Sequence, residues 1–412
     1  MKYVVLGSSA AGISGIRELR RLDPDSGIVL VSRDEMIYSR CILHHYLGGE
    51  RTMEQLNFAE KDFDRVYQVD WKRGRTCIRL NRENKSISLD NGETVSYDKL
   101  LIATGAHTYM PEIPGLGEAV NAIGFRNIED IQVLKEAAAH AEHIVVMGAG
   151  LVGMDCVTGL LDAGVKPVLV ETARWMLAKQ LDETAAARYQ EAFAGKGVKQ
   201  YYGHGISRVE LDPGKRITEL VLDDGTCLPC DCLVVTAGVR ANVEFLEGSG
   251  LTLGRQGLVY DETGKTSDPH IYGAGDVSGA RPIWPVAVKE GIVAASNMAG
   301  GSQRMTDFFA SKSTMNFLGI PSMSLGDVNP AQEEGRAEIC QTKDSYKKII
   351  HRNGKITGAI LQGDLAYGGI LQQLIARKVD ITKVKKPVFD IDYSDFFHMD
   401  ENFEFYYEMN SQ

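Results

Sequence analysis

The sequence lacks both a long apolar run and a surplus of positive charge. No stretch of about 18 or more apolar residues occurs in its 412 residues, so a membrane-spanning helix is not expected. The net charge of -10 disfavours binding to nucleic acid or to an anionic membrane. The N-terminus, MKYVVLGSSAAG, has one lysine and a short apolar run that leads into a glycine turn, which predicts a first strand rather than a signal peptide. We therefore expect a cytoplasmic protein.

The chain also lacks the cysteine pattern of a disulfide framework. Its seven cysteines are an odd number, and only Cys227, Cys230 and Cys232 cluster, in CLPCDC. A DDG turn before this segment predicts a hairpin, with the cysteines on its short strands. A structural zinc site would need a fourth ligand nearby, which the sequence does not indicate, so we expect no metal. The length predicts two or three domains.

Two patterns of strand, glycine turn and helix are present. The first is YVVLGSSAAG at residues 3–12, after which apolar residues recur at helical spacing. The second is IVVMGAGLVG at residues 144–153, which contains a full G-x-G-x-x-G. Glycines at these positions let a pyrophosphate approach backbone N–H groups at a helix start. One such motif is weak evidence, but two in the right context predict two dinucleotide sites.

In each pattern a second strand is expected after the helix, and the last residue of that strand differs between the two patterns. In the second pattern the strand KPVLVE ends at Glu171, an acid that can accept hydrogen bonds from a ribose and would repel a 2'-phosphate. This predicts a preference for NADH over NADPH, which the nearby Arg174 weakens. In the first pattern Ser32 stands where the acid is usually found, and Arg33 and Asp34 follow. Either Asp34 replaces the acid or the ribose contact is weaker.

Further motifs follow in a characteristic order. SYDKLLIATGA (residues 96–106) and TSDPHIYGAGDVS (residues 266–278) are short apolar strands that end in small residues, and Asp276 in the second can accept hydrogen bonds from a polyol. Together with YSR at 38–40 and TAGVRAN at 236–242, these motifs resemble the pyridine nucleotide-disulfide oxidoreductase superfamily of FAD enzymes. The resemblance covers residues 1 to about 385 and is closest to the NADH:rubredoxin reductase, nitrite reductase and ferredoxin reductase branch.

The resemblance implies an α/β fold with two Rossmann-like nucleotide-binding domains, for FAD and NAD, and a C-terminal α/β domain. The expected segments are 1–112 and 243–306 for FAD, 113–242 for NADH, 307–386 for a C-terminal interface domain, and 387–412 for an acidic aromatic tail. An NG turn within YKKIIHRNGKITGAILQGD supports a hairpin in the C-terminal domain. The family also implies a homodimer, and a larger redox complex is the alternative assembly.

The resemblance implies hydride transfer from NADH to FAD and assigns the cofactor-binding residues. They are Gly7, Ser9, Ala10, Ala11, Gly12, Ser32, Arg33, Asp34, Arg40, Ala103, Thr104, Gly105, Arg126, Gly148, Gly150, Val152, Gly153, Glu171, Gly238, Gly275, Asp276 and Trp284. For Trp284 a core position is an equally good interpretation. Asp155 matches an acid that pairs with a lysine beside the flavin, and that lysine falls on His45 here. A His45–Asp155 pair is therefore one hypothesis, and an ordinary polar helix position for His45 is the other.

Cys41, in YSRCILHHYLG, supports two interpretations. NADH oxidases, peroxidases and coenzyme A-disulfide reductases of this superfamily have a redox cysteine at this spacing before Y-L-G, and a thiolate near Arg40 at a helix start would be reactive. However, Arg40 and Ile42 replace the serine and glycine beside that cysteine, and Ala10 replaces the peroxidase histidine. The alternative is that Cys41 is simply a small residue at the helix start, in place of the proline that follows YSR in the rubredoxin reductase branch. No C-x4-C pair is present, which excludes the glutathione-reductase type of chemistry.

Residues 389–412 contain seven acids, eight aromatic residues and neither Lys nor Arg. So many aromatic residues are unusual for a solvated tail, so the segment is expected to dock on its own chain or on a partner. The sequence as a whole predicts an FAD enzyme that takes hydride from NADH and reduces a protein such as rubredoxin or an iron–sulfur protein. The alternatives are a Cys41-dependent NADH oxidase, peroxidase or coenzyme A-disulfide reductase, and a flavin-carrying subunit of a larger electron-transfer complex.

Overall fold

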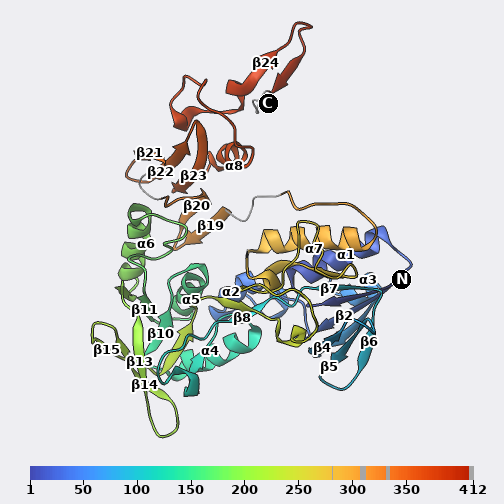
Figure 1. Ribbon diagram of the computed structural model, residues 1–412. Coiled ribbons are helices and arrows are strands. Elements are labelled where there is room, and N and C mark those ends of the chain that lie inside the picture. Colours follow the sequence, from blue (N-terminus) through green and yellow to red (C-terminus); the bar gives the residue numbers. More distant parts are fainter. Residues whose placement is uncertain (281, 307–311, 331–334, 408–412) are drawn as a thin grey trace. The chain divides into compact units, whose positions relative to one another are not determined.

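The computed structural model describes residues 1–280, 282–306, 312–330 and 335–407. The chain forms two compact units of mixed α/β structure, shown with their elements in Figure 1, and this confirms the expected fold class. The first unit consists of Met1–Glu112, Ile123–His140 and Val235–Ala310, and the second of Ile113–Ala122, Ala141–Val234 and Ser311–Gln412.

A five-stranded parallel sheet forms the centre of the first unit. In spatial order its strands are β18 (Ile271–Gly273), β7 (Lys99–Ile102), β1 (Lys2–Leu6), β2 (Gly27–Ser32) and β3 (Val69–Arg73). Val4 and Val5 point to opposite faces of β1 and both are fully buried. A sheet buried on both faces explains why these strands are continuous apolar runs rather than alternating ones.

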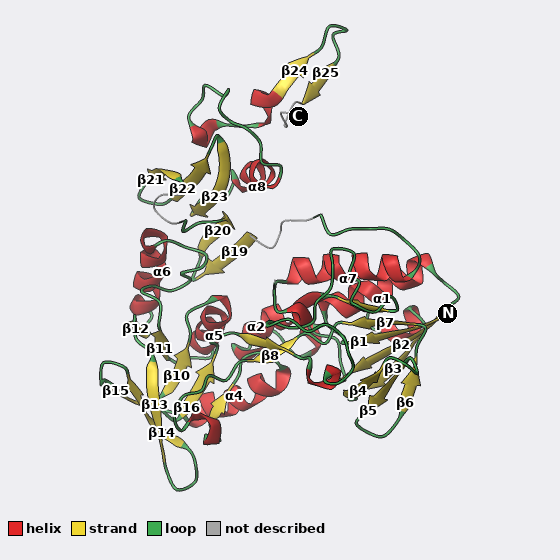
Figure 2. Ribbon diagram, viewed as in Figure 1, coloured by secondary structure: helices red, strands yellow, loops and turns green. Residues whose placement is uncertain are grey.

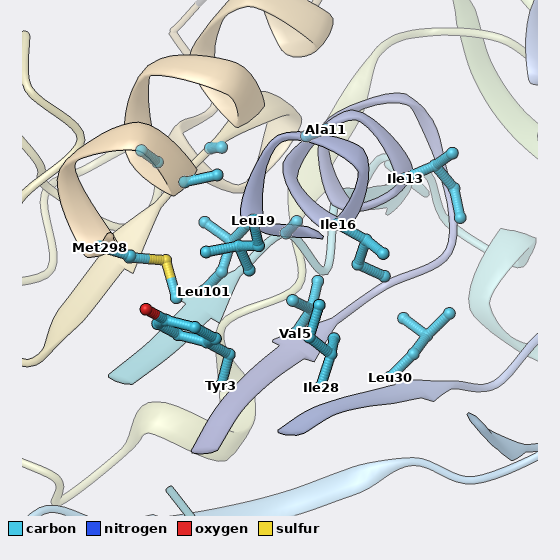
Figure 3. Close-up of a cluster of buried hydrophobic side chains, with 14 of the residues drawn as sticks. Tyr3, Val5, Ala11, Ile13, Ile16, Leu19, Ile28, Leu30, Leu101 and Met298 are labelled. Atoms are coloured by element: carbon cyan, nitrogen blue, oxygen red, sulfur yellow. The ribbon is translucent and has the colours of Figure 1, made fainter. Parts of the chain in front are cut away.

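Two helices cover one face of this sheet. They are α1 (Ala10–Leu22) and α7 (Trp284–Met298), which pack on the apolar cluster shown in Figure 3. Ile13, Ile16 and Leu19 of α1 are fully buried, as their helical spacing predicts. The other face is covered by an antiparallel sheet of β4 (Cys77–Asn81), β5 (Ser86–Leu89) and β6 (Thr94–Ser96). The remaining elements are α2 (Leu43–Leu47), α3 (Phe63–Val66), β8 (Ala106–Thr108), α4 (Ile128–His140) and β17 (Val239–Ala241).

The second unit contains another sheet with a parallel core. Its spatial order is β12 (Lys199–Tyr202), β11 (Val168–Glu171), β10 (Ile144–Met147), β16 (Cys232–Val235) and β9 (Ala122–Ile123). Its helices are α5 (Leu151–Asp162) and α6 (Glu183–Gly195), and β13 (Ile206–Leu211), β14 (Ile217–Leu222) and β15 (Cys227–Pro229) form a separate antiparallel sheet. The pattern of strand, glycine turn and helix therefore occurs once in each unit.

The C-terminal part of the second unit is an antiparallel sheet with one helix, α8 (Gly368–Ala376), visible in Figure 2. In spatial order the strands are β19 (Lys312–Phe317), β20 (Ile320–Gly326), β23 (Lys355–Gln362), β22 (Tyr346–Arg352) and β21 (Arg336–Gln341). Asn353 and Gly354 join β22 to β23 with φ of +50° and +73°, so the predicted NG hairpin is confirmed. The last elements are β24 (Phe397–Met399) and β25 (Phe405–Tyr407).

Candidate functional site

The first glycine turn joins β1 to α1. Gly7 has a φ of +108°, and a Cβ atom on it would collide with the carbonyl oxygen of Ala103. A Cβ atom on Gly12 would in turn collide with the carbonyl oxygen of Gly7. Within the described part of the chain, the buried hydroxyl of Ser8 has no hydrogen-bond partner. With Ser9 as the N-cap of α1, this narrow turn fits the diphosphate of a dinucleotide.

Ser32, at the end of β2, and Asp34, in the loop that follows, are the candidates for the position at which an acid commonly binds a ribose. The Ser32 hydroxyl donates to the backbone carbonyl of Asp34 (2.6 Å) and accepts from Nε1 of Trp71 (2.8 Å). The Asp34 carboxylate forms an ion pair with Arg40 (2.6 Å), whose guanidinium lies over the ring of Tyr38. The structure thus brings Asp34 and Arg40 together, while the next residue after Ser32, Arg33, is exposed.

Arg126 and Asp276 come from distant parts of the sequence and form an ion pair of 2.6 Å. Arg126 Nε also donates to the carbonyl of Ala106 (2.7 Å), so the guanidinium is held on two sides. Gly275, next to Asp276, donates its N–H to the Glu290 carboxylate (2.8 Å). Sequence reasoning missed Glu290, although a charged residue among the small residues of WPVAVKEG was a usable signal.

Side-chain and backbone hydrogen bonds join residues 103–105 (ATG) to the TAGVRAN segment. Asn242 donates to the carbonyl of Thr104 (2.8 Å), and the Thr104 hydroxyl donates to the carbonyl of Asn242 (2.9 Å). The N–H of Asn242 also donates to the carbonyl of Gly105. Gly238, with a φ of +120°, accepts from the N–H of Tyr109. Asn242 was not among the predicted site residues, and the motif TAGVRAN was its signal.

The second glycine turn joins β10 to α5. Gly148 has a φ of +106°, and Gly150 is the N-cap of α5, with open space where a side chain would lie. The Glu171 carboxylate accepts from the backbone N–H of Ala149 (2.6 Å) and of Ala173 (2.8 Å). Glu171 therefore lies beside the glycine turn, at the position where a ribose next to a bound diphosphate would contact it. Val152 in the first turn of α5 is 43% exposed, and the turn fits a second dinucleotide.

The predicted pair His45 and Asp155 lies in different units, and the pairing stays a prediction. His45 forms an ion pair through Nδ1 with Glu50 (2.5 Å). Its ring lies 4.0 Å from that of His44, and burial lowers the pKa of His44 to about 4. Asp155 is largely buried in α5, and this burial raises the pKa of its carboxyl to about 7.

Cys41 is exposed and lies in a 3-10 turn of three residues, Arg40–Ile42, directly before α2. Arg40, the cation expected to stabilise a thiolate there, is engaged by Asp34. Trp284 begins α7 and packs edge-to-face on Phe58 with ring centroids 4.7 Å apart. It is only partly buried, so both interpretations of this tryptophan remain open.

The second unit contains a cluster of cysteines and a cluster of two acids with one histidine. Burial raises the pKa of Cys230 to about 12 and of Cys232 to about 11, which keeps both thiols protonated. In the described ranges, one group has donor atoms close enough for a metal, His204, Asp223 and Asp224. Asp223 and Asp224 lie in the exposed turn between β14 and β15, and the half-buried His204 lies in the loop between β12 and β13. No helix among the described residues is long and apolar enough to cross a membrane.

Comparison with known proteins gives matches over most of the chain. Residues 1–291 match the family model described as Pyridine nucleotide-disulphide oxidoreductase, and residues 312–379 match that of the Rubredoxin NAD+ reductase C-terminal domain. The chain is 30% identical to the NADH-dependent phenylglyoxylate dehydrogenase subunit epsilon of Aromatoleum evansii, over 93% of each chain. It is 27% identical to the assimilatory nitrate reductase electron transfer subunit of Bacillus subtilis, over 94% of this chain and 51% of the relative.

One solved structure has a similar fold over the same range. The NAD-dependent persulfide reductase from A. fulgidus is 25% identical, with a TM-score of 0.83 over 91% of this chain and 76% of the other. The chain thus spans nearly all of the Aromatoleum subunit but about half of the Bacillus protein.

Proposed function

Because this chain belongs to the pyridine nucleotide-disulphide oxidoreductase family, we propose that it takes hydride from NADH and passes the electrons through FAD to rubredoxin or another iron–sulfur protein. The family confirms the expected NADH-dependent flavoprotein oxidoreductase and its cofactors, FAD and NADH. The match of residues 312–379 to a rubredoxin reductase C-terminal domain is the observation that carries the choice of acceptor.

The proposed cofactor sites follow the two glycine turns. Residues 1–112 and 243–306 would bind FAD, and residues 113–242 would bind NADH. The turn at Gly7, with the unpartnered Ser8 hydroxyl, supports the first site, and the open turn at Gly150 supports the second. Glu171 would accept hydrogen bonds from the ribose of NADH and repel a 2'-phosphate. These residue roles are proposals that the geometry supports.

The protein's contribution is to hold and orient the reactants. Bound FAD accepts an electron pair as hydride and can release electrons singly, which suits a one-electron acceptor. Arg126 would hold the Asp276 carboxylate in place for the polyol of the cofactor, because its guanidinium is fixed from two sides. His45, oriented by Glu50, would stabilise negative charge that develops beside it during reduction.

Anaerobic reduction tests this proposal. NADH should remove the absorbance of the oxidised flavin, and NADPH should do so more slowly. The reduced enzyme is then mixed with rubredoxin, a ferredoxin, coenzyme A disulfide, peroxide and oxygen in separate experiments. Fastest turnover with an iron–sulfur protein is expected. Fastest turnover with the disulfide or with peroxide would overturn the choice of acceptor and leave the NADH site intact.

A second candidate is a flavin-carrying subunit of a larger electron-transfer complex. The observation that favours it is the Aromatoleum relative, which is named as a subunit and matches this chain over 93% of both lengths. In that case the purified chain would reduce small acceptors with NADH but reduce rubredoxin and ferredoxin poorly. A stoichiometric complex purified from the native cell would support this candidate, and an isolated chain with full activity on a redox protein would contradict it.

The thiol-dependent alternative is tested at one position. The similarity to a persulfide reductase keeps it under consideration, and Cys41 is exposed. Cys41→Ser should leave NADH-dependent reduction of a redox protein unchanged, because that transfer needs no thiol. Loss of activity in Cys41→Ser, with the buried Cys77→Ser as a control for cysteine loss elsewhere, would favour the thiol mechanism.

A further inference from the structure

The C-terminal tail divides into two parts, of which the first docks on its own domain. Val388, Ile391 and Phe396 are buried in the core of the C-terminal domain. The Tyr367 hydroxyl donates to the carbonyls of Val388 and Ile391. Lys386 forms ion pairs with both Asp392 and Asp395, so this lysine offsets part of the negative charge of the first part (Lys386 Nζ to Asp395 Oδ1, 2.8 Å).

The second part, residues 397–407, is an antiparallel hairpin of β24 and β25 that we call the acidic hairpin (Figure 2). Among its described side chains, Phe397 is exposed to 43%, Met399 to 52%, Phe403 to 77% and Tyr406 to 46%. A two-stranded hairpin is at best marginally stable in water without a further apolar surface to pack on. Large exposed apolar side chains gathered on one element usually mark an interface.

The tip of the acidic hairpin carries an aromatic residue that the turn does not require. Asp400 accepts from the backbone N–H of Asn402 (2.8 Å) and of Glu404 (2.9 Å), so its carboxylate builds the turn. Phe403 adopts a φ of +65°, a conformation that favours glycine and is unfavourable for a bulky side chain. Since the ring is also 77% exposed, it contributes little to folding and is available for a contact.

The charge of the acidic hairpin indicates what it contacts. Asp400, Glu401 and Glu404 lie within its described residues, and neither Lys nor Arg occurs after residue 386. The whole chain has a net charge of -10, so a second copy would bring more negative charge to this surface. A surface with positive charge around an apolar strip would complement both features, the carboxylates and the exposed apolar side chains.

We propose that the acidic hairpin is the docking element for a partner protein whose surface presents an apolar strip bordered by Lys and Arg side chains. The proposal goes beyond the proposed function, because it assigns the surface chemistry of a partner protein and does not require that this partner be the electron acceptor. Phe397 and Met399, which lie on one face of β24, supply the apolar contact together with Phe403 at the tip, and Glu401 and Glu404 supply the charge that selects a basic surface.

The test uses cytochrome c, a basic one-electron carrier with lysines around an apolar haem edge, as the probe. A carbodiimide couples a carboxylate to a lysine only where the two are in contact. The holoenzyme is coupled to cytochrome c at low salt and the joined peptides are mapped. Coupling is expected to concentrate on Glu401 and Glu404. Coupling spread over acids elsewhere, coupling to lysines of the same chain or of a second copy, or no coupling would each overturn the proposal.

Variants separate the charge from the apolar contact. Glu401→Gln/Glu404→Gln and Met399→Ser/Phe403→Ser should each raise the Kd for cytochrome c by about threefold or more. The control Glu83→Gln/Glu247→Gln removes the same charge from exposed positions elsewhere and should leave the Kd unchanged. An equal change in the control and the hairpin variants would overturn the proposal.

A second readout distinguishes failure of this inference from failure of the proposed function. All variants should oxidise NADH with ferricyanide, a small acceptor, at the wild-type rate. If the wild-type protein does not reduce ferricyanide with NADH, the proposed function fails. If it does and the Kd values do not depend on the hairpin, only the docking element fails.

Discussion

Glu50, which no motif in the sequence marks, is the ion-pair partner of His45 in the structure. The two residues are close in sequence, but the family pattern directed attention to Asp155 instead. A carboxylate beside one ring nitrogen fixes the orientation of the imidazole ring, and the proposed role of His45 beside the flavin would use that fixed orientation. At the scale of single residues, the proposed role of His45 therefore depends on its contact with Glu50, which the sequence motifs did not indicate.

On the proposed mechanism, His45→Ala should slow the reduction of the flavin by NADH by about tenfold or more, because it removes the side chain proposed to lie beside the flavin. Glu50→Gln should slow it less, since the imidazole stays but loses its anionic partner. Both rates are measured by anaerobic stopped-flow absorbance. His140→Ala, at an exposed position of α4, is the matched control. An unchanged rate in His45→Ala would remove His45 from the mechanism.

Asp155 makes stability depend on pH. Burial raises its pKa from the ordinary 3.8 to about 7, so in the intervening range the folded chain keeps a proton that the unfolded chain has released. Stability should therefore fall as the pH rises through this range and level off above it. Asp155→Asn has no carboxyl to ionise, so its free energy of unfolding should not fall in this way. Above neutral pH, its stability relative to wild type should therefore be higher by on the order of 2–4 kcal/mol than at the acidic end.

The measurement is urea unfolding of wild type and Asp155→Asn, without NADH, at several pH values from 3.8 to about 7 and above. The two proteins should be similarly stable at the acidic end and diverge toward neutral pH. Parallel profiles would show that burial does not set the protonation of this carboxyl.

At the scale of elements, glycines decide how closely α1 and α7 pack. A Cβ atom on Gly291 of α7 would collide with the backbone carbonyl of Ala11 in α1, so only glycine allows this approach. The N-terminal end of α1 adjoins the turn proposed to bind the diphosphate, and α7 begins at Trp284. Helix packing and the geometry of the candidate flavin site are therefore set by the same contact.

Gly291→Ala should destabilise the protein by about 1–3 kcal/mol, because the backbone atoms it meets cannot rotate away. It should also lower the amount of FAD that copurifies. The matched control is Gly195→Ala in α6, where a Cβ atom meets open space and a small stabilisation is expected. Thermal unfolding and flavin content are the measurements. Equal behaviour of the two variants would contradict this role for Gly291.

At the scale of the whole molecule, one carboxylate links α6 to the C-terminal sheet. Asp182 caps α6 by accepting from the N–H of Ala185 (3.0 Å). Its other oxygen accepts from the Tyr346 hydroxyl (2.6 Å) and from Lys348 Nζ (2.9 Å). The side chain of Asp182 is 14% exposed and that of Lys348 is 15% exposed. Burial and the carboxylate together raise the pKa of Tyr346, which therefore remains a hydroxyl donor.

Asp182→Ala should cost about 2–4 kcal/mol, since it removes a helix cap and leaves the Lys348 ammonium largely buried without its partner. Asp182→Ala/Lys348→Met should recover part of this loss, because the unpaired charge is gone. Urea unfolding of the single and double variants measures both effects. A double variant less stable than Asp182→Ala would contradict the explanation based on an unpaired charge.

The sequence by itself determined the elements whose signals are local. Both glycine turns, the buried parallel strands and the NG hairpin depend on residues within a few positions of one another, and the structure has all of them. The family match confirms the cofactors that the glycine motifs predicted. Helical spacing likewise identified the face of α1 that packs on the sheet. Local backbone sterics and the periods of helix and strand are sufficient for such features.

Only the tertiary structure decided which side chains meet. Arg126 and Asp276 are 150 residues apart, and Thr104 and Asn242 are 138 apart, yet each pair is joined by hydrogen bonds of 2.9 Å or less. The structure also separated the tail into a docked part and an exposed hairpin, although composition treated it as one segment. The reason is physical: side-chain pairing depends on how sheets and helices fold back on one another, and no local period records that geometry.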